Sequence, residues 1–115
     1  MPINRYEDEG VASYWNNKYN QDYHPYLHGR QRKVLELLTS LNLPEGSRCL
    51  ELGTGGGQNA VKYAELGLKV HGVDSSDELL KTAHDLAQSG SNLEFSNVDL
   101  NMPMPFEDSS FDVVV

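Results

Sequence analysis

Hydrophobic positions along residues 30–115 alternate between the spacing of a helix and the spacing of a strand. Apolar residues three and four apart predict amphipathic helices, whereas short runs that are apolar almost throughout predict buried strands. The expected helices cover about residues 30–41, 58–66 and 76–88, and the expected strands cover residues 48–52, 68–73, 93–98 and 111–115. A loop that contains two prolines separates the last two strands.

Turn and capping residues mark the ends of these elements. The first helix is expected to end before the turn Pro44-Glu45-Gly46, and the second is expected to end at Gly67. Ser75 followed by Glu78 matches a capping box, which predicts that Ser75 caps the third helix. The apolar residues of the first helix are expected to form one buried face, made of Val34, Leu35, Leu37, Leu38 and Leu41.

The alternation of strands and helices predicts an α/β fold with a Rossmann-like, doubly wound parallel sheet. Each crossover is long enough to return the chain to the same end of the sheet, so neighbouring strands are expected to run parallel. Residues 1–29 are polar and aromatic without a clear period, and we expect an arm or lid there that includes Tyr14, Trp15 and Tyr19. We expect the sheet domain, residues 30–115, to be incomplete, because the sequence ends within the fourth strand.

Composition is typical of a folded domain without a membrane segment. Of 115 residues, 38% are hydrophobic and 23% are charged, which suits a globular domain rather than a disordered tail. No apolar run approaches the roughly 18 residues of a membrane helix, and the acidic N-terminus does not resemble a signal peptide. The single cysteine, Cys49, has no partner for an internal disulfide and is expected in the core. A cytoplasmic location is therefore expected.

Charge and residue spacing weigh against two kinds of ligand. Seventeen acidic and nine basic residues give a net charge of −8, which disfavours a nucleic-acid surface. His24 and His28 have the spacing of metal ligands on a helix, but Pro25 is expected to interrupt that helix, and the sequence offers no third ligand. No metal site is expected.

Residues that carry chemistry recur at the carboxyl ends of the first three expected strands. Gly53–Gly57 follow the first strand, Asp74 ends the second and Asp99 follows the third. Parallel sheets bind ligands at this edge, where glycines let a ligand approach the backbone and an acidic side chain accepts hydrogen bonds from ribose hydroxyls. A nucleoside-containing cofactor is implied. NAD is the weaker choice, because Gln58 occupies the last glycine position of the dinucleotide fingerprint, and the P-loop spacing is absent.

The glycine turn reads Glu-Leu-Gly-Thr-Gly-Gly-Gly at residues 51–57. It resembles the first motif, (Asp/Glu)-x-Gly-x-Gly-x-Gly, of the class I S-adenosylmethionine-dependent methyltransferases. Residues 70–76 and 97–100 are similar to the second and third motifs of that family, and residues 105–114 to the stretch that leads into its fourth strand. The resemblance covers about residues 30–115. Residues 57–60 and 64–67 are also similar to small-molecule members of the tellurite-resistance type.

The resemblance implies a site for S-adenosylmethionine. Glu51 and the backbone of Gly53 and Gly55 would hold the methionine end, Asp74 would bind the ribose hydroxyls, and Asp99 would meet the adenine amino group. The full set of expected cofactor-binding residues is Glu51, Gly53, Thr54, Gly55, Gly57, Asp74, Ser75, Asp99 and Leu100. No lysine or arginine is expected nearby, so these carboxylates suit the positive sulfonium and ammonium groups of the cofactor.

The implied activity is transfer of a methyl group from S-adenosylmethionine to an acceptor, and the negative charge favours a small molecule. No catalytic residue is assigned, because the family builds its acceptor site beyond the fourth strand. The alternatives are a non-catalytic module that binds the nucleoside cofactor and, less favoured, an NAD-dependent oxidoreductase. Residues 113–115 would leave an open sheet edge, which predicts self-association.

Overall fold

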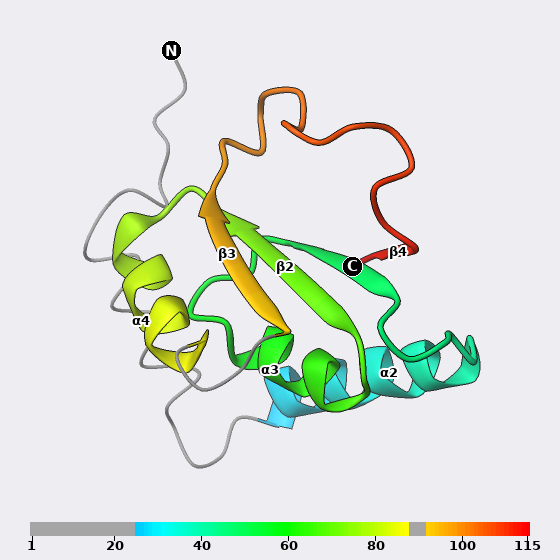
Figure 1. Ribbon diagram of the computed structural model, residues 1–115. Helices are drawn as coiled ribbons and strands as arrows, with labels where there is room; N and C mark the ends of the chain where they lie inside the picture. The colour runs from blue at the N-terminus through cyan, green and yellow to red at the C-terminus, as the bar shows by residue number, and fades with distance from the viewer. Residues whose placement is uncertain (1–24, 88–91) are drawn as a thin grey trace.

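The computed structural model describes residues 25–87 and 92–115 (Figure 1). Within these ranges the helices are α2 (Pro25–Ser40), α3 (Gln58–Glu65) and α4 (Asp77–Ala87). The strands are β1 (Arg48–Leu52), β2 (Lys69–Asp74), β3 (Leu93–Asn97) and β4 (Val113–Val114). The expected lid residues Tyr14, Trp15 and Tyr19 lie outside the described residues, and so does His24 of the histidine pair.

The strands form one parallel sheet in the order β3-β2-β1-β4. In β1, Cys49 is opposite Val70 of β2 on one side and opposite Val113 of β4 on the other. The chain builds the sheet outward from β1 to β3 and then returns to the other side of β1 to add β4. This arrangement confirms the expected α/β, Rossmann-like parallel sheet, although β4 is shorter than the expected strand over residues 111–115.

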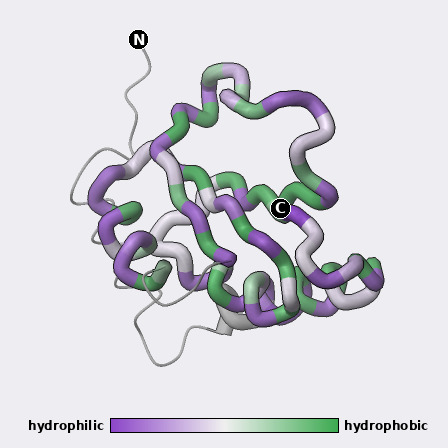
Figure 2. Tube along the Cα trace, in the orientation of Figure 1, coloured by the Kyte–Doolittle hydropathy of each residue, from purple (hydrophilic) through white to green (hydrophobic). Residues whose placement is uncertain are grey.

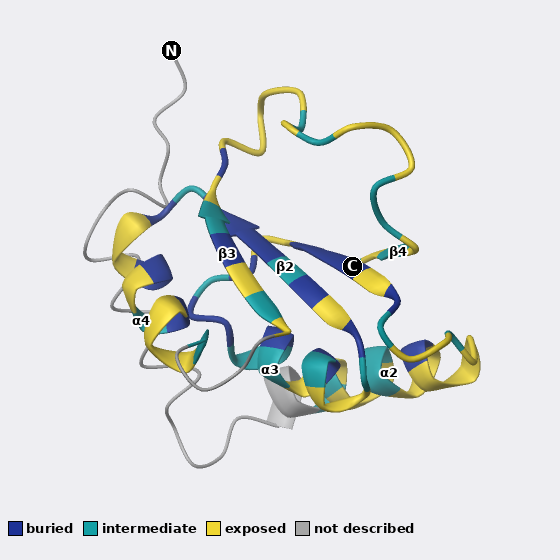
Figure 3. Ribbon diagram, viewed as in Figure 1, coloured by how far each residue is buried: buried dark blue, intermediate teal, exposed yellow. Residues whose placement is uncertain are grey.

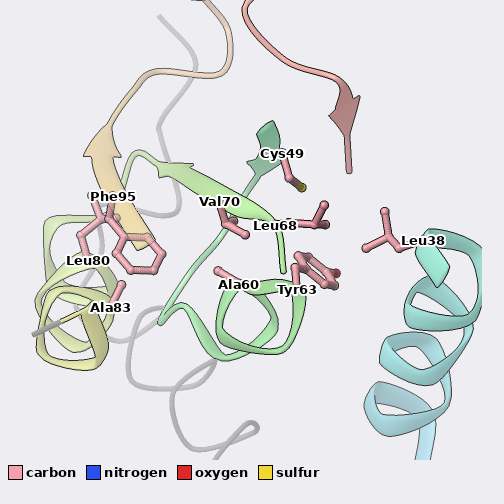
Figure 4. Close-up of a cluster of buried hydrophobic side chains, with 9 residues drawn as sticks. All are labelled: Leu38, Cys49, Ala60, Tyr63, Leu68, Val70, Leu80, Ala83 and Phe95. Carbon is pink, nitrogen blue, oxygen red and sulfur yellow. The ribbon is translucent and has the colours of Figure 1, made fainter. Parts of the chain in front are cut away.

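The larger core lies between the sheet and the helices. Figure 4 shows its buried side chains, which come from α2, α3, α4, three of the strands and the turn before β2: Leu38, Cys49, Ala60, Tyr63, Leu68, Val70, Leu80, Ala83 and Phe95. Fully burying a large apolar side chain of this kind contributes about 1.5–3 kcal/mol to stability. In Figure 2 the colour along α4 alternates between hydrophilic and hydrophobic, as expected of a helix that packs on a sheet with one face.

The opposite face of the sheet is covered by the loop between β3 and β4. Phe106 and Phe111 of this loop pack edge to face with their ring centroids 5.1 Å apart, and Phe106 packs in the same way on His71 of β2. With Met104 they cover a second buried cluster, formed by Leu50, Val73 and Val98. Figure 3 accordingly shows more buried residues in β1 and β2 than in β3 and β4, which form the edges of the sheet.

Helix α2 differs from its sequence prediction. It begins at Pro25, whose fixed φ suits the first helical turn, so this proline starts the helix rather than interrupting it. Leu38 is buried, whereas Leu37 and Leu41 are more than half exposed, so the expected single apolar face was wrong for these two residues. The reason is geometric: Leu37 is turned about 100° from Leu38, and Leu41 follows the last helical residue.

The start of α4 corrects the expected capping box. The helix begins at Asp77, and the Ser76 hydroxyl accepts a hydrogen bond from the Leu79 N–H at 3.2 Å. Ser76 is therefore the capping residue, and the prediction of Ser75 with Glu78 was wrong by one position. Ser75 instead lies on the wall of a cleft at the edge of the sheet.

Candidate functional site

A cleft of about 480 Å³ opens at the carboxyl ends of the central strands. Its lining includes Leu52 at the end of β1, Asp74 at the end of β2 and Val115 just beyond β4. Leu79 of α4 and Leu100 of the loop after β3 add apolar surface. The cleft therefore lies where the strand order reverses, which is the position at which open α/β sheets bind their ligands.

The glycine-rich loop after β1 contributes to the lining of this cleft, and its glycines have backbone conformations that other residues rarely adopt. The φ angles of Gly53, Gly55 and Gly57 are 71°, 57° and 82°, all in the left-handed region. The loop is held to β2 by the Thr54 N–H, which donates to the Val73 carbonyl at 2.9 Å. The glycines thus let the chain turn sharply between β1 and α3.

Asp74 joins the glycine loop to the start of α4. Its Oδ2 accepts a hydrogen bond from the Gly55 N–H and its Oδ1 accepts one from the Ser76 N–H, both at 2.9 Å. The Gly55 N–H, which was expected to help hold a ligand, is therefore committed to Asp74. Asp74 is 6% exposed and lines the cleft. Because each carboxylate oxygen can accept two hydrogen bonds, it keeps acceptor capacity for the hydroxyl groups of a ligand.

Glu51 is a second buried carboxyl group in the cleft wall. The Thr54 hydroxyl donates to its Oε1 at 2.5 Å, and the Tyr63 hydroxyl also forms a hydrogen bond to it. Burial raises the pKa of Glu51 to about 7 with help from the charge of Asp74, although the two hydroxyl groups act in the opposite direction. The cleft therefore contains a carboxyl group that changes charge near neutral pH.

Seven of the nine sequence-predicted site residues line the cleft, namely Glu51, Gly53, Thr54, Gly55, Asp74, Ser75 and Leu100. Gly57 does not line it: a Cβ atom there would lie 2.9 Å from Phe95 and 3.1 Å from Ala83, so the glycine allows close packing behind the loop. Asp99 does not line it either; it is exposed, and its carboxylate accepts a hydrogen bond from the Asn101 N–H at 2.9 Å. The roles of all nine residues toward a cofactor stay predictions.

Besides Leu79 of α4, helices α2 and α3 supply cleft residues that were not among the predicted site residues. They are Arg30, Gln31 and Val34 of α2 and Asn59 and Tyr63 of α3. Gln31 donates a hydrogen bond to Asn59 at 2.7 Å, which ties α2 to α3 beside the cleft. The sequence prediction assigns none of these residues to the site, and the packing of α2 beside α3 brings them to it.

Arg30 corrects the expectation that no basic residue lies near the site. Among the described residues that line the cleft it is the only lysine or arginine, and it shares the lining with the carboxyl groups of Glu51 and Asp74. The cleft therefore offers partners for both signs of charge. Such a set suits a ligand that carries an ammonium and a carboxylate group together.

Three other features of residues 25–87 and 92–115 bear on metal binding, membrane crossing and cysteine reactivity. No group of three or more histidine, cysteine, aspartate or glutamate side chains is placed there to hold a metal ion. Within the same ranges, no helix has the length and apolar character that crossing a membrane requires. The Cys49 thiol is fully buried, and burial together with the charge of Glu51 raises its pKa to about 11, so it is no nucleophile at neutral pH.

Comparison with known proteins identifies the family. Residues 49–115 match the family described as "Methyltransferase domain", so the chain belongs to this family. The protein YqeM of Bacillus subtilis (strain 168), named as a methyltransferase, is 36% identical over 74 residues, which is 64% of this chain and 30% of that protein. The expected class, the class I S-adenosylmethionine-dependent methyltransferases, is confirmed, and S-adenosylmethionine is confirmed as its cofactor.

Two solved structures share the fold. Phosphoethanolamine N-methyltransferase 2 of Haemonchus contortus, in complex with S-adenosyl-L-methionine, is 31% identical with a TM-score of 0.61, covering 72% of this chain and 20% of that one. The cyclase SpnF is 27% identical with a TM-score of 0.66, covering 83% of this chain and 36% of that one. The chain spans about a third of the length of the curated relatives it matches.

Proposed function

We propose that this chain forms the cofactor-binding part of a cytoplasmic enzyme that transfers a methyl group from S-adenosylmethionine to a small-molecule acceptor. The main support is the cleft at the reversal of strand order, which combines a glycine loop with the carboxyl groups of Glu51 and Asp74 in a domain of the methyltransferase family. The net charge of −8 favours a small acceptor over nucleic acid.

The lining of the cleft matches the parts of this cofactor. The remaining acceptor capacity of Asp74 suits the ribose hydroxyls. Glu51 suits the ammonium group of the methionine moiety, and Arg30 suits its carboxylate. Leu100 offers an apolar contact for the adenine ring, and neighbouring Asp99 is retained as the proposed partner of the adenine amino group.

For methyl transfer, the main task of the protein is to position the cofactor and the acceptor. The cofactor supplies a methyl group on a sulfonium, which is already an active donor. The residues of the cleft would bind and orient the cofactor so that an acceptor can approach in line with the bond that breaks. A general base is needed only where the acceptor must lose a proton.

A calorimetric titration with S-adenosylhomocysteine, with NAD as the parallel ligand, tests the cofactor assignment. We expect saturable binding of S-adenosylhomocysteine alone, because the carboxyl groups of Glu51 and Asp74 disfavour a pyrophosphate. Binding of NAD alone would contradict the proposal and support the oxidoreductase alternative. Failure of a folded sample to bind either ligand would also contradict it.

Replacing Asp74 by asparagine should weaken binding of S-adenosylhomocysteine roughly tenfold to a hundredfold, the size expected for losing charge-assisted hydrogen bonds of about 1.5–3 kcal/mol. Asp85→Asn removes the same charge from the exposed side of α4 and should leave the affinity unchanged. Thermal unfolding of both variants separates loss of folding from loss of binding. Undiminished affinity in a folded Asp74→Asn variant would sink the assignment of Asp74.

The second candidate function is binding of the nucleoside cofactor without methyl transfer. One observation favours it: the cyclase SpnF shares the fold, and a shared fold does not determine the reaction. Formation of S-adenosylhomocysteine from S-adenosylmethionine by the full-length protein distinguishes the two. Turnover with an oxygen or nitrogen acceptor supports methyl transfer, whereas tight cofactor binding without turnover supports the binding module.

We also propose that copies of this chain associate through β4. Among the described strands, β3 and β4 each have a partner on one side only, and Val114 of β4 is 56% exposed. An open strand edge with apolar side chains favours pairing between molecules. Sedimentation at increasing concentration should show association, and Val114→Lys should shift the protein toward the monomer. A parent protein that stays monomeric at every concentration would contradict this proposal.

A further inference from the structure

Glu51 and its two hydroxyl partners form a cluster that the glycine motif does not explain. Glu51 lies near the end of β1, Thr54 lies in the glycine loop and Tyr63 belongs to α3. All three line the cleft, although none is more than 6% exposed. The cluster is thus largely shielded from water and still adjoins the space that a ligand would occupy.

The two hydroxyl groups suit both protonation states of Glu51. A hydroxyl can donate to an ionised carboxylate, and it can also accept a hydrogen bond from a protonated carboxyl group. The Thr54 hydroxyl is 2.5 Å from Oε1, and the Tyr63 hydroxyl bonds to the same carboxyl group. Backbone N–H groups or an arginine would serve the charged form only, because they cannot accept. Glu51 therefore keeps its hydrogen bonds whether it holds or loses a proton.

The surroundings of Glu51 raise its pKa while no ligand cation is bound. Burial opposes ionisation, and Asp74 of β2 is a charge of the same sign. Cys49 of β1 stays neutral below pH 11, the value to which its pKa is raised. On the helical side, α2 contributes Arg30 and α4 contributes the apolar Leu79. A positively charged group in the cleft would add an attraction that exists only for the ionised form of Glu51.

We propose that Tyr63 and Thr54 are positioning residues that make Glu51 a proton-releasing receptor for the positively charged end of the cofactor. Before binding, a fraction of the Glu51 carboxyl groups carries a proton near neutral pH. When S-adenosylmethionine binds, the carboxyl O–H bond breaks, the proton passes to solvent and the carboxylate pairs with the cofactor ammonium group. This inference rests on the proposed function.

Cofactor affinity should consequently rise with pH between 6 and 8. With a pKa of about 7, the ionised fraction of Glu51 increases from about one tenth to about nine tenths over this range. The dissociation constant should therefore fall roughly tenfold, because only the ionised fraction is competent to pair with the ammonium group. At pH 7, binding should release about half a proton per site.

Calorimetry with S-adenosylhomocysteine in phosphate and in Tris buffer measures the released proton, because the two buffers differ in their heat of protonation. The control ligand is 5′-methylthioadenosine, which keeps the adenosine group and lacks the amino-acid moiety, so it should release no proton. The variant Glu51→Gln should bind S-adenosylhomocysteine with no proton release and with an affinity that does not change between pH 6 and pH 8.

The variant Tyr63→Phe tests the positioning role, because it keeps the buried ring and removes one donor to the carboxylate. The midpoint of affinity against pH should move upward, and raising the pH should restore binding. Thr54→Val should act in the same direction. Ser96→Ala is the matched control, since its hydroxyl bonds to His71 outside the cleft. A purely structural role would lower the affinity equally at every pH, which would overturn the inference.

The remaining outcomes separate this inference from the proposed function. Binding of S-adenosylhomocysteine without proton release, and with a constant affinity between pH 6 and pH 8, would overturn the inference and leave the proposed function intact. Absence of S-adenosylhomocysteine binding at every pH would overturn both.

Discussion

At the residue scale, three carboxylates at strand ends have different surroundings. Asp74 accepts two backbone hydrogen bonds and organises the loop beside it. Glu51 is buried among hydroxyl groups, and its pKa is raised to about 7. Asp99 follows β3 in the same way, yet it is exposed, and its carboxylate accepts a hydrogen bond from the N–H of nearby Asn101. The turn that follows each strand, rather than the strand end itself, decides which carboxylate reaches the cleft.

Replacing Glu51 by glutamine should stabilise the protein at pH 8 and change little at pH 5. The pKa of Glu51 is about 7 in the folded chain against an ordinary value of 4.5, so the native state binds this proton more tightly than the unfolded state. The resulting stability is fully present below pH 4.5 and is lost as the pH rises through 7. The loss amounts to roughly 3 kcal/mol, since each pKa unit is worth about 1.4 kcal/mol.

Urea unfolding at the two pH values measures this effect. Glu107→Gln, which removes a carboxylate from an exposed loop position, is the control and should change the free energy of unfolding little at either pH. An effect of Glu51→Gln that is equal at pH 5 and pH 8 would contradict the prediction.

At the scale of elements, two adjacent residues in the turn between β2 and α4 have different roles: one caps the helix and the other lines the cleft. Ser76 caps α4 through the Leu79 N–H and donates its own N–H to Asp74. Ser75, one position earlier, lines the cleft. A shift of the helix start by one residue would exchange these roles, so the cap fixes which side chain is available to a ligand.

The variant Ser76→Ala should lower the free energy of unfolding by about 1 kcal/mol, the usual effect of losing a capping hydroxyl. Ser75→Ala should cost less, because the hydroxyl of Ser75 does not cap the helix. Urea unfolding compares the two variants under identical conditions. A larger loss in Ser75→Ala than in Ser76→Ala would restore the capping box that the sequence predicts.

At the scale of the whole molecule, the glycine loop packs directly on the helix and strand behind it. A Cβ atom at Gly57 would lie 2.9 Å from Phe95 of β3 and 3.1 Å from Ala83 of α4. These two residues belong to the larger core, which also contains Tyr63 of α3. The glycine loop therefore packs on Phe95 and Ala83, which also belong to the core between α4 and the sheet.

Replacing Gly57 by alanine should destabilise the protein by about 1–3 kcal/mol more than replacing Gly46 does, because the added methyl group overpacks the core. The comparison is matched, since both glycines have a φ of +82° and Gly46 has no atom within 4 Å of the added Cβ. Backbone strain is therefore shared, and the difference isolates packing. Equal losses in thermal or urea unfolding would show that the core accommodates the methyl group.

The sequence by itself determined the features that depend on short-range pattern. The alternation of strands and helices, the bounds of β1 and the sharp turn at Gly53–Gly57 follow from periodicity and turn chemistry within about ten residues. The positions of Glu51 and Asp74 at strand ends follow from the same spacing. These local motifs lie within residues 49–115, which match the methyltransferase family.

Only the tertiary structure decided which helix faces are buried and which distant residues share the cleft. Leu37 is exposed because α2 packs through another side, and Leu41 is exposed just beyond the end of the helix. Arg30 lines the cleft, and Gln31 meets Asn59 across 28 positions of sequence, because α2 lies against α3 beside the reversal of strand order. Spacing within one helix describes its own faces and does not specify the neighbour that each face will meet, so these contacts form only when the elements pack.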